Sequence, residues 1–89
     1  MGKTVMLAMV ECKAKRVVKE LGVKYGVGRS LRVIVRGNQK RIRLILLFGG
    51  QCIFIGTIAN ASSSFPFVGM MWEQMQEALA IYLSGNAVA

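Results

Sequence analysis

The residues best suited to chemistry are six basic side chains that fall within fifteen positions, with no acidic residue among them. They are Arg29, Arg32, Arg36, Lys40, Arg41 and Arg43. Guanidinium and ammonium groups clustered in this way neutralise phosphates, either of nucleic acid or of anionic lipid head groups. The plainer interpretation is a solvated face, although six charges without an acid exceed what solubility requires. The cluster therefore predicts a site for phosphates or lipid head groups.

Two carboxylates stand four positions apart in the second half of the chain, at Glu73 and Glu77. Paired carboxylates can bind a metal ion or share a proton, but two oxygen ligands do not complete a metal site. At helical spacing they form a polar stripe that faces water or a basic partner. Trp72 precedes them and is typical of an interface. We predict that these three residues contact a partner protein.

Nothing in the sequence assembles into a catalytic group. The chain has no His, so the serines at 62–64 and the two cysteines, Cys12 and Cys52, have no evident general base. Two distant cysteines make neither a disulfide framework nor a CxxC zinc motif, and we expect both to be reduced and buried. The sequence therefore predicts no enzymatic activity, no cofactor and no metal.

Charge is divided sharply along the chain. Residues 1–43 contain all twelve Lys and Arg and two Glu, a net charge of +10, whereas residues 44–89 contain only two Glu, a net charge of −2. The eighteen residues Leu44–Ala61 contain no charged side chain. Lys and Arg beside an uncharged run are typical of the side of a membrane span that is not translocated.

Helical periodicity appears twice. Residues 3–21 predict a basic amphipathic helix that ends at Gly22, with an apolar stripe of Leu7, Val10, Ala14, Val17, Val18 and Leu21. Residues 67–84 predict a second amphipathic helix, with an apolar stripe of Val68, Met71, Trp72, Met75, Leu79 and Tyr82.

The predicted fold depends on whether the uncharged run forms one helix or two strands. As a helix, Leu44–Ala61 would be about 27 Å long, close to the thickness of a bilayer's hydrocarbon core. We therefore expect a mainly α chain. It would comprise a basic membrane-surface segment over 1–43, a transmembrane helix over 44–61, and a loop with an interfacial helix over 62–89.

The same run also fits two strands. Arg41–Phe48 and Cys52–Ile58 would flank a turn at Gly49-Gly50-Gln51, and Leu31–Arg36 would supply a third strand. This alternative is a small α+β domain with the element order α-β-β-β-α. In it Arg32 and Arg36 share a sheet face with Ile34, and Arg41 and Arg43 join them from the neighbouring strand as a compact patch for phosphates.

Three functions follow from these folds. The first is a small non-catalytic membrane-anchored subunit that assembles or stabilises a larger membrane complex. Its basic segment would lie on the cytoplasmic, matrix or stromal side, against anionic lipid head groups and other membrane subunits.

The alternative is a soluble α-β-β-β-α module that binds DNA or RNA phosphates. Several small nucleic-acid-binding domains share that element order, but only one aromatic ring, Tyr25, lies near the basic cluster. A further alternative is a filament or shell subunit that self-assembles through its apolar half.

Overall fold

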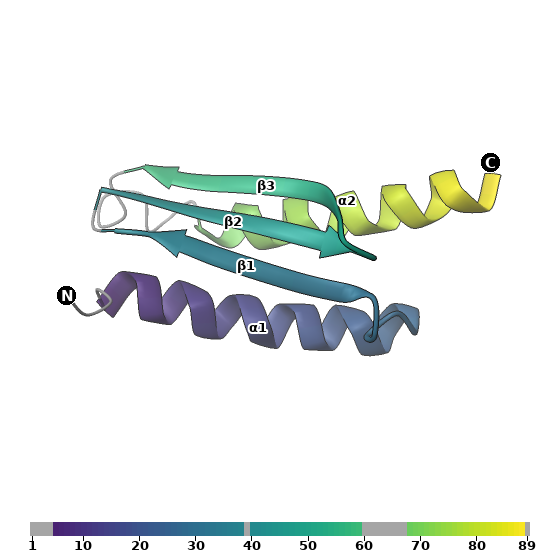
Figure 1. Ribbon diagram of the computed structural model, residues 1–89, viewed down its shortest axis with the longest axis horizontal. Helices are drawn as coiled ribbons and strands as arrows, with labels where there is room; N and C mark the ends of the chain where they lie inside the picture. Colours follow the sequence, from purple (N-terminus) through teal and green to yellow (C-terminus); the bar gives the residue numbers. More distant parts are fainter. Residues whose placement is uncertain (1–4, 39, 60–67, 89) are drawn as a thin grey trace.

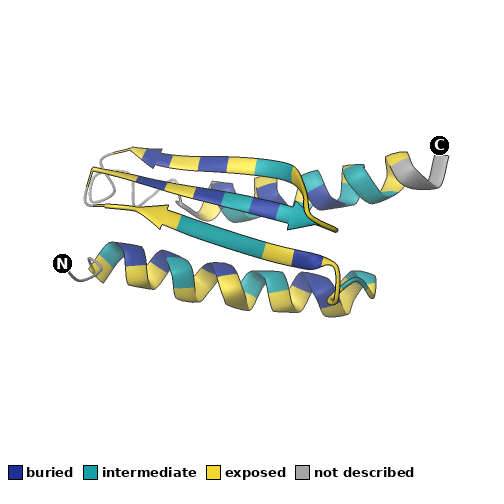
Figure 2. Ribbon diagram, in the orientation of Figure 1, coloured by how far each residue is buried: buried dark blue, intermediate teal, exposed yellow. Residues whose placement is uncertain are grey.

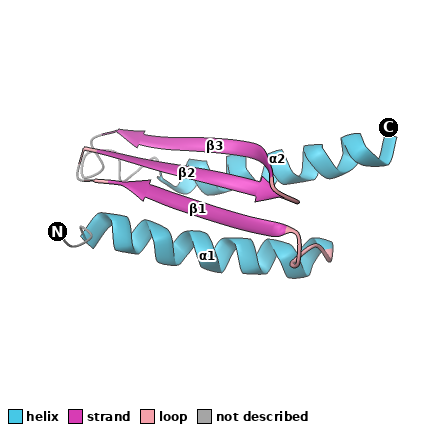
Figure 3. Ribbon diagram, viewed as in Figure 1, coloured by secondary structure: helices cyan, strands magenta, loops and turns pink. Residues whose placement is uncertain are grey.

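The chain forms two layers, a three-stranded sheet and a pair of helices. The computed structural model describes residues 5–38, 40–59 and 68–88. Its elements are α1 (Val5–Tyr25), β1 (Leu31–Gly37), β2 (Arg41–Phe48), β3 (Gln51–Ala59) and α2 (Val68–Val88), shown in Figures 1 and 3. The sheet is antiparallel with strand order β1-β2-β3. Helix α1 packs against β1, α2 packs against β3, and the two helices touch each other.

The uncharged run is a hairpin and not a membrane helix. Its first five residues complete β2, and β3 follows after Gly49 and Gly50, whose φ angles are +60° and +86°. Positive φ at both central positions gives a type I′ turn, which matches the twist of paired strands. In the described part of the chain, no helix has the length and apolarity needed to cross a bilayer. Asn60 and Ala61 lie outside the described residues.

Several predictions are therefore wrong: the mainly α fold, the transmembrane helix over 44–61 and the membrane location of the basic segment. The alternative α+β fold with the order α-β-β-β-α is confirmed. The physical reason is that β2 is buried on one face only. Ile42, Leu44 and Leu46 are buried, while the alternate residues Arg41 and Arg43 are exposed. A period of two in burial belongs to a strand, because successive side chains of a strand point to opposite faces.

Helix α1 extends one turn beyond the predicted end. Gly22 lies inside the helix and is buried, and a Cβ there would come within 2.8 Å of the Gly28 Cα. The helix ends at Tyr25, followed by Gly26 with a φ of +69°. Val27 N donates to Gly22 O (2.9 Å) and Gly26 N donates to Val23 O (3.3 Å), which is the Schellman pattern of helix ends. Gly22 thus permits close packing of the connector that leads into β1.

The core lies between the inner face of the sheet and the two helices (Figure 2). The first predicted apolar stripe faces it, as do Met71, Met75 and Leu79 of the second, with Val17, Val18 and Trp72 partly buried at its margin. The side chain of Val68 lies outside the described part of the structure. Gly56 of β3 allows α2 to approach closely, because a Cβ there would lie 2.8 Å from the Met71 Sδ. The buried side chains are Leu7, Val10, Ala14, Leu21, Leu31, Ile42, Leu44, Leu46, Ile58, Met71, Met75 and Leu79.

Candidate nucleic-acid interface

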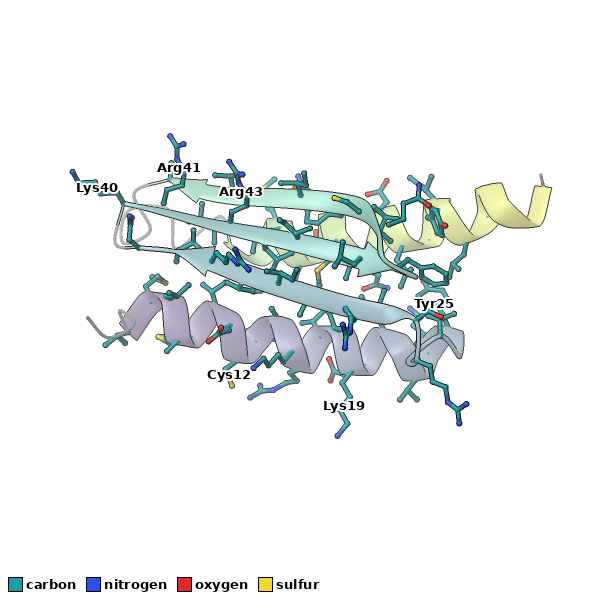
Figure 4. All side chains as sticks on the ribbon, viewed as in Figure 1. Cys12, Lys19, Tyr25, Lys40, Arg41 and Arg43 are labelled. Atoms are coloured by element: carbon teal, nitrogen blue, oxygen red, sulfur yellow. The ribbon has the colours of Figure 1, made fainter. Side chains whose placement is uncertain are left out.

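The sheet face turned away from both helices, here called the outer face, carries most of the predicted basic cluster. The strand register places Arg36 of β1 directly opposite Arg43 of β2. Arg41 lies two residues before Arg43 on the same strand. All three side chains are exposed. Arg41 and Arg43 point to the same side of β2, away from α1, in Figure 4. The alternation of β1 and β2 therefore brings three guanidinium groups together at one end of the sheet.

The Arg36–Arg43 pair is electrostatically unfavourable in the free protein. Like charges placed directly opposite each other on neighbouring strands destabilise a sheet. The three strands contain no Asp or Glu, so no carboxylate within them offsets the repulsion. Thr57 of β3 is the other cross-strand neighbour of Arg43. This end of the outer face thus offers guanidinium donors and one hydroxyl group to an anion.

The β1–β2 hairpin holds this basic end in place. Asn38 N donates to Arg41 O (2.9 Å), and the Asn38 Oδ1 accepts from Lys40 N (2.8 Å) and Arg41 N (3.1 Å). Gly37 has a φ of +150°, and a Cβ there would clash with the Arg41 carbonyl oxygen. A side chain at position 37 would therefore displace Arg41. The hairpin fixes the backbone from which Lys40 and Arg41 project.

The basic end is hollowed. A shallow depression of about 530 Å³ opens there, large enough for several phosphate oxygens and their waters. Its lining combines arginines, an amide and two apolar side chains, with the residues Ile34, Arg36, Gly37, Asn38, Arg41, Arg43 and Ile45. Guanidinium groups bind phosphate through paired N–H donors, which a concave arrangement can direct toward one anion.

An apolar row crosses the outer face beside the arginines. Ile34, Ile45 and Ile55 pair in register across the three strands. Ile55 is 58% exposed, and the other two are partly buried. Beyond this row Arg32 stands opposite Leu47. The outer face therefore presents an apolar strip with arginines on either side of it.

The structure separates the six predicted basic residues into two groups. Arg36, Lys40, Arg41 and Arg43 gather at the β1–β2 hairpin end. Arg32 lies beyond the isoleucine row, and Arg29 is exposed in the turn that precedes β1, at the other end of that strand. The sequence interpretation placed Ile34 on the face of Arg32 and Arg36 but missed Asn38, Thr57, Ile45 and Ile55. Strand alternation was the available signal, because it predicts which neighbouring residues share a sheet face with the arginines.

The predicted partner-contact residues lie on α2. Glu73 and Glu77 are exposed, in agreement with a polar stripe on that helix. Trp72 is partly buried and packs against the core. Contact of these residues with a partner stays a prediction, and the packing of Trp72 accounts for its apolar surface without one.

The prediction of two buried cysteines does not hold. Cys12 on α1 and Cys52 on β3 are both exposed, and neither forms a disulfide bond. Cys52 stands opposite Leu47 on the outer face, next to the irregularity in the β2–β3 register. Neither thiol has the surroundings of a metal site, since no group of three or more His, Cys, Asp or Glu gathers among the described residues.

A second hollow, of about 560 Å³, lies along the outer edge of β1, between that strand and α1. Three basic side chains line it, Lys15 and Lys19 from α1 and Arg32 from β1. Its apolar lining includes Val18, Leu31 and other residues that flank the core. Basic side chains therefore lie along the β1 edge of the sheet.

No protein-family model, curated protein or solved structure matches this chain, so its own residues and surfaces carry the functional inference.

Proposed function

We propose that the outer face of the sheet binds the phosphate backbone of nucleic acid. The observation that carries this proposal is the exposed Arg36–Arg43 pair with Arg41 beside it, on strands that contain no acidic residue. A like-charge pair of this kind is retained at a cost to stability. An anion bound between the guanidinium groups removes that cost. The chain's formal charge of +8 also favours association with polyanions.

The isoleucine row favours a single strand over a duplex. Ile34, Ile45 and Ile55 lie next to the arginine rows, and successive same-face rows of a strand are about 7 Å apart. A single strand whose phosphates contact the arginines can lay its exposed bases and sugars on the apolar row. A duplex keeps its bases stacked inside and would leave the row uncovered. Stacking by aromatic rings, the usual means of holding single strands, is replaced here by aliphatic contact.

The salt dependence of binding tests the proposal. Phosphate neutralisation releases counterions, so the affinity for a random-sequence single-stranded oligonucleotide must fall linearly on a log–log plot against salt. The double variant Arg36→Ala/Arg43→Ala should reduce the magnitude of that slope by about 1.4, since each lost contact with a single strand contributes about 0.7.

A matched control is the double variant Lys13→Ala/Arg16→Ala. It removes the same formal charge from exposed positions of α1, on the helical side of the molecule. We expect its salt slope to stay within error of the unaltered chain. Equal losses in both double variants, or a flat slope for the unaltered chain, would remove the outer face as a nucleic-acid site. Binding to anionic phospholipid vesicles with no binding to the oligonucleotide would assign the arginines to lipid head groups instead.

A further inference from the structure

The two edges of the sheet are protected very differently. The β1 edge carries Arg32 and Arg36 and is flanked by α1, with Lys15 and Lys19 lining the hollow beside it. Among the described residues, neither a charged side chain nor a flanking helix protects the β3 edge in this way. Its nine residues, Gln51–Ala59, include no charged residue and no proline. Along its length β3 forms the upper margin of the molecule in Figure 1, with neither helix beyond it. Charged side chains, prolines and covering elements are what prevent edge strands from pairing with other chains.

The register shows which backbone groups this edge presents. Gly49 N donates to Ser30 O (2.9 Å), so alternate residues of β2 starting from Arg43 exchange hydrogen bonds with β1. The other residues of β2, including Leu44, then bond to their β3 partners. In β3 those partners include Gly56. The residues on either side of it, Ile55 and Thr57, direct their N–H and C=O groups to the outer edge.

We propose that β3 is a homodimer interface, at which the β3 strands of two copies pair antiparallel about a two-fold axis through Gly56. Ile55 of one copy then stands opposite Thr57 of the other, and each pair exchanges two backbone hydrogen bonds. The extra residue Ile53 lies opposite the step from Leu46 to Leu47, and the pairing with the second copy involves residues 54–58, which follow this bulge.

A second copy of this chain is the occupant that the charges favour. Association through the outer face or through β1 would bring arginine against arginine. The β3 edge joins uncharged strand to uncharged strand and places the Arg36–Arg43 groups at the far sides of the dimer. Pairing also places the Thr57 methyl group beside Ile55, which is 58% exposed in the single chain. Because a two-fold axis normal to the sheet keeps both outer faces on one side, the dimer presents its two arginine groups on the same surface, separated by the two uncharged β3 strands.

The test is the mass of the protein in solution, measured without nucleic acid. Sedimentation equilibrium over a range of protein concentrations should give a species of twice the 9.8 kDa chain mass. Thr57→Pro deletes an N–H that faces the edge and leaves the β2–β3 hydrogen bonds intact, whereas the control Thr57→Val keeps that N–H. We expect Thr57→Pro to raise the dimer dissociation constant by about tenfold or more, since the symmetric interface loses two hydrogen bonds.

A second pair of variants tests the edge without altering the backbone. Ile55→Lys puts a charge on β3, and Ile34→Lys puts the same charge in the same isoleucine row on β1. Only Ile55→Lys should dissociate the dimer, with circular dichroism confirming that both variants are folded. A wild-type chain that sediments at 9.8 kDa at every concentration would overturn the proposal, as would equal dissociation by both lysine variants. A monomer that still bound oligonucleotide would leave the phosphate site standing, so the two proposals fail separately.

Discussion

The two faces of the sheet are made of alternate residues from the same three strands, yet they have opposite chemistry. On β2 the inner residues Ile42, Leu44 and Leu46 are fully buried, whereas their neighbours Arg41 and Arg43 are exposed. Helix α1 packs against β1 and α2 against β3, and buried residues of both helices form one core with the inner face. The helices complete the core from one side, so the outer face can concentrate positive charge without disturbing it. Stability and the proposed binding therefore depend on different residues of one strand.

Truncation of adjacent residues of β2 should give the greatest contrast between the two faces. Leu44→Ala should lower the free energy of unfolding by about 2–5 kcal/mol, because Leu44 has no exposed surface and its removal leaves a cavity. Arg43→Ala should change it by about 0.5 kcal/mol or less, or raise it slightly by relieving repulsion with Arg36. Urea denaturation followed by circular dichroism measures both. Similar losses in the two variants would contradict the assignment of inner and outer faces.

The next largest effect is expected at the hairpin that sets the register of the two faces. Gly37→Ala should lower the free energy of unfolding by about 1–3 kcal/mol, since its Cβ would clash with the Arg41 carbonyl oxygen. Gly85→Ala in α2 is the control, because a Cβ there meets nothing within 4 Å. Its expected effect is a gain of up to about 1 kcal/mol from helix propensity. Thermal unfolding of both variants tests the difference, and a neutral Gly37→Ala would show that the hairpin tolerates another conformation.

A smaller effect should distinguish the apolar contribution of the outer face to binding from its electrostatic contribution. Ile45→Thr keeps a β-branched side chain and removes apolar surface from the centre of the isoleucine row. We expect single-strand affinity to fall about fivefold, since partial burial of one aliphatic side chain contributes on the order of 1 kcal/mol. The salt slope should not change, because no charge is lost. Fluorescence anisotropy with single-stranded and duplex oligonucleotides of equal length measures both. Equal losses for the two substrates would remove the preference for a single strand.

The weakest effect is that of removing the Tyr82 hydroxyl, at the contact between α2 and the β2–β3 turn. The Tyr82 hydroxyl lies 3.3 Å from the Gln51 Oε1, and its ring lies 5.1 Å from that of Phe48. Tyr82→Phe keeps the ring contact and should cost about 0.5 kcal/mol or less, because the hydrogen bond is exposed. Tyr82→Ala removes the ring as well and should cost about 1–2 kcal/mol more. Chemical denaturation of the two variants distinguishes ring packing from hydrogen bonding as the tie between helix and sheet.

Most of the secondary structure could be predicted from local patterns. The bounds expected for the strand alternative, Leu31–Arg36, Arg41–Phe48 and Cys52–Ile58, agree with the observed strands to within one residue. Alternation also placed Arg32, Ile34 and Arg36 on a single face, and the register confirms this. The first helix was predicted to end at Gly22, four residues before its actual C-terminal glycine. A glycine required for close packing and a glycine required for a helix end look the same in sequence.

The principal error lay in Leu44–Ala61, and its cause is general. A run of apolar residues is consistent with a membrane helix, a buried helix or a strand pair, because length and hydropathy do not encode what covers the segment. The Gly49-Gly50 pair was the local signal for a hairpin. The adjacent block of basic residues outweighed it in the interpretation, because such a block is also typical of the flank of a membrane span. In the folded chain those same charges belong to the uncovered face of the sheet.

Three features can be recognised in the amino-acid sequence alone: the periodicity of each segment, the concentration of Lys and Arg before Leu44, and the two faces of each amphipathic element. These are properties of neighbouring residues, and local geometry fixes them. Folding adds three features that no local pattern fixes: residues of both helices share one core with the inner face, Arg36 lies opposite Arg43, and the uncharged strand β3 is an edge of the sheet. Each of those outcomes depends on packing between segments far apart in the chain, where burial of apolar surface selects one arrangement among several that local patterns permit.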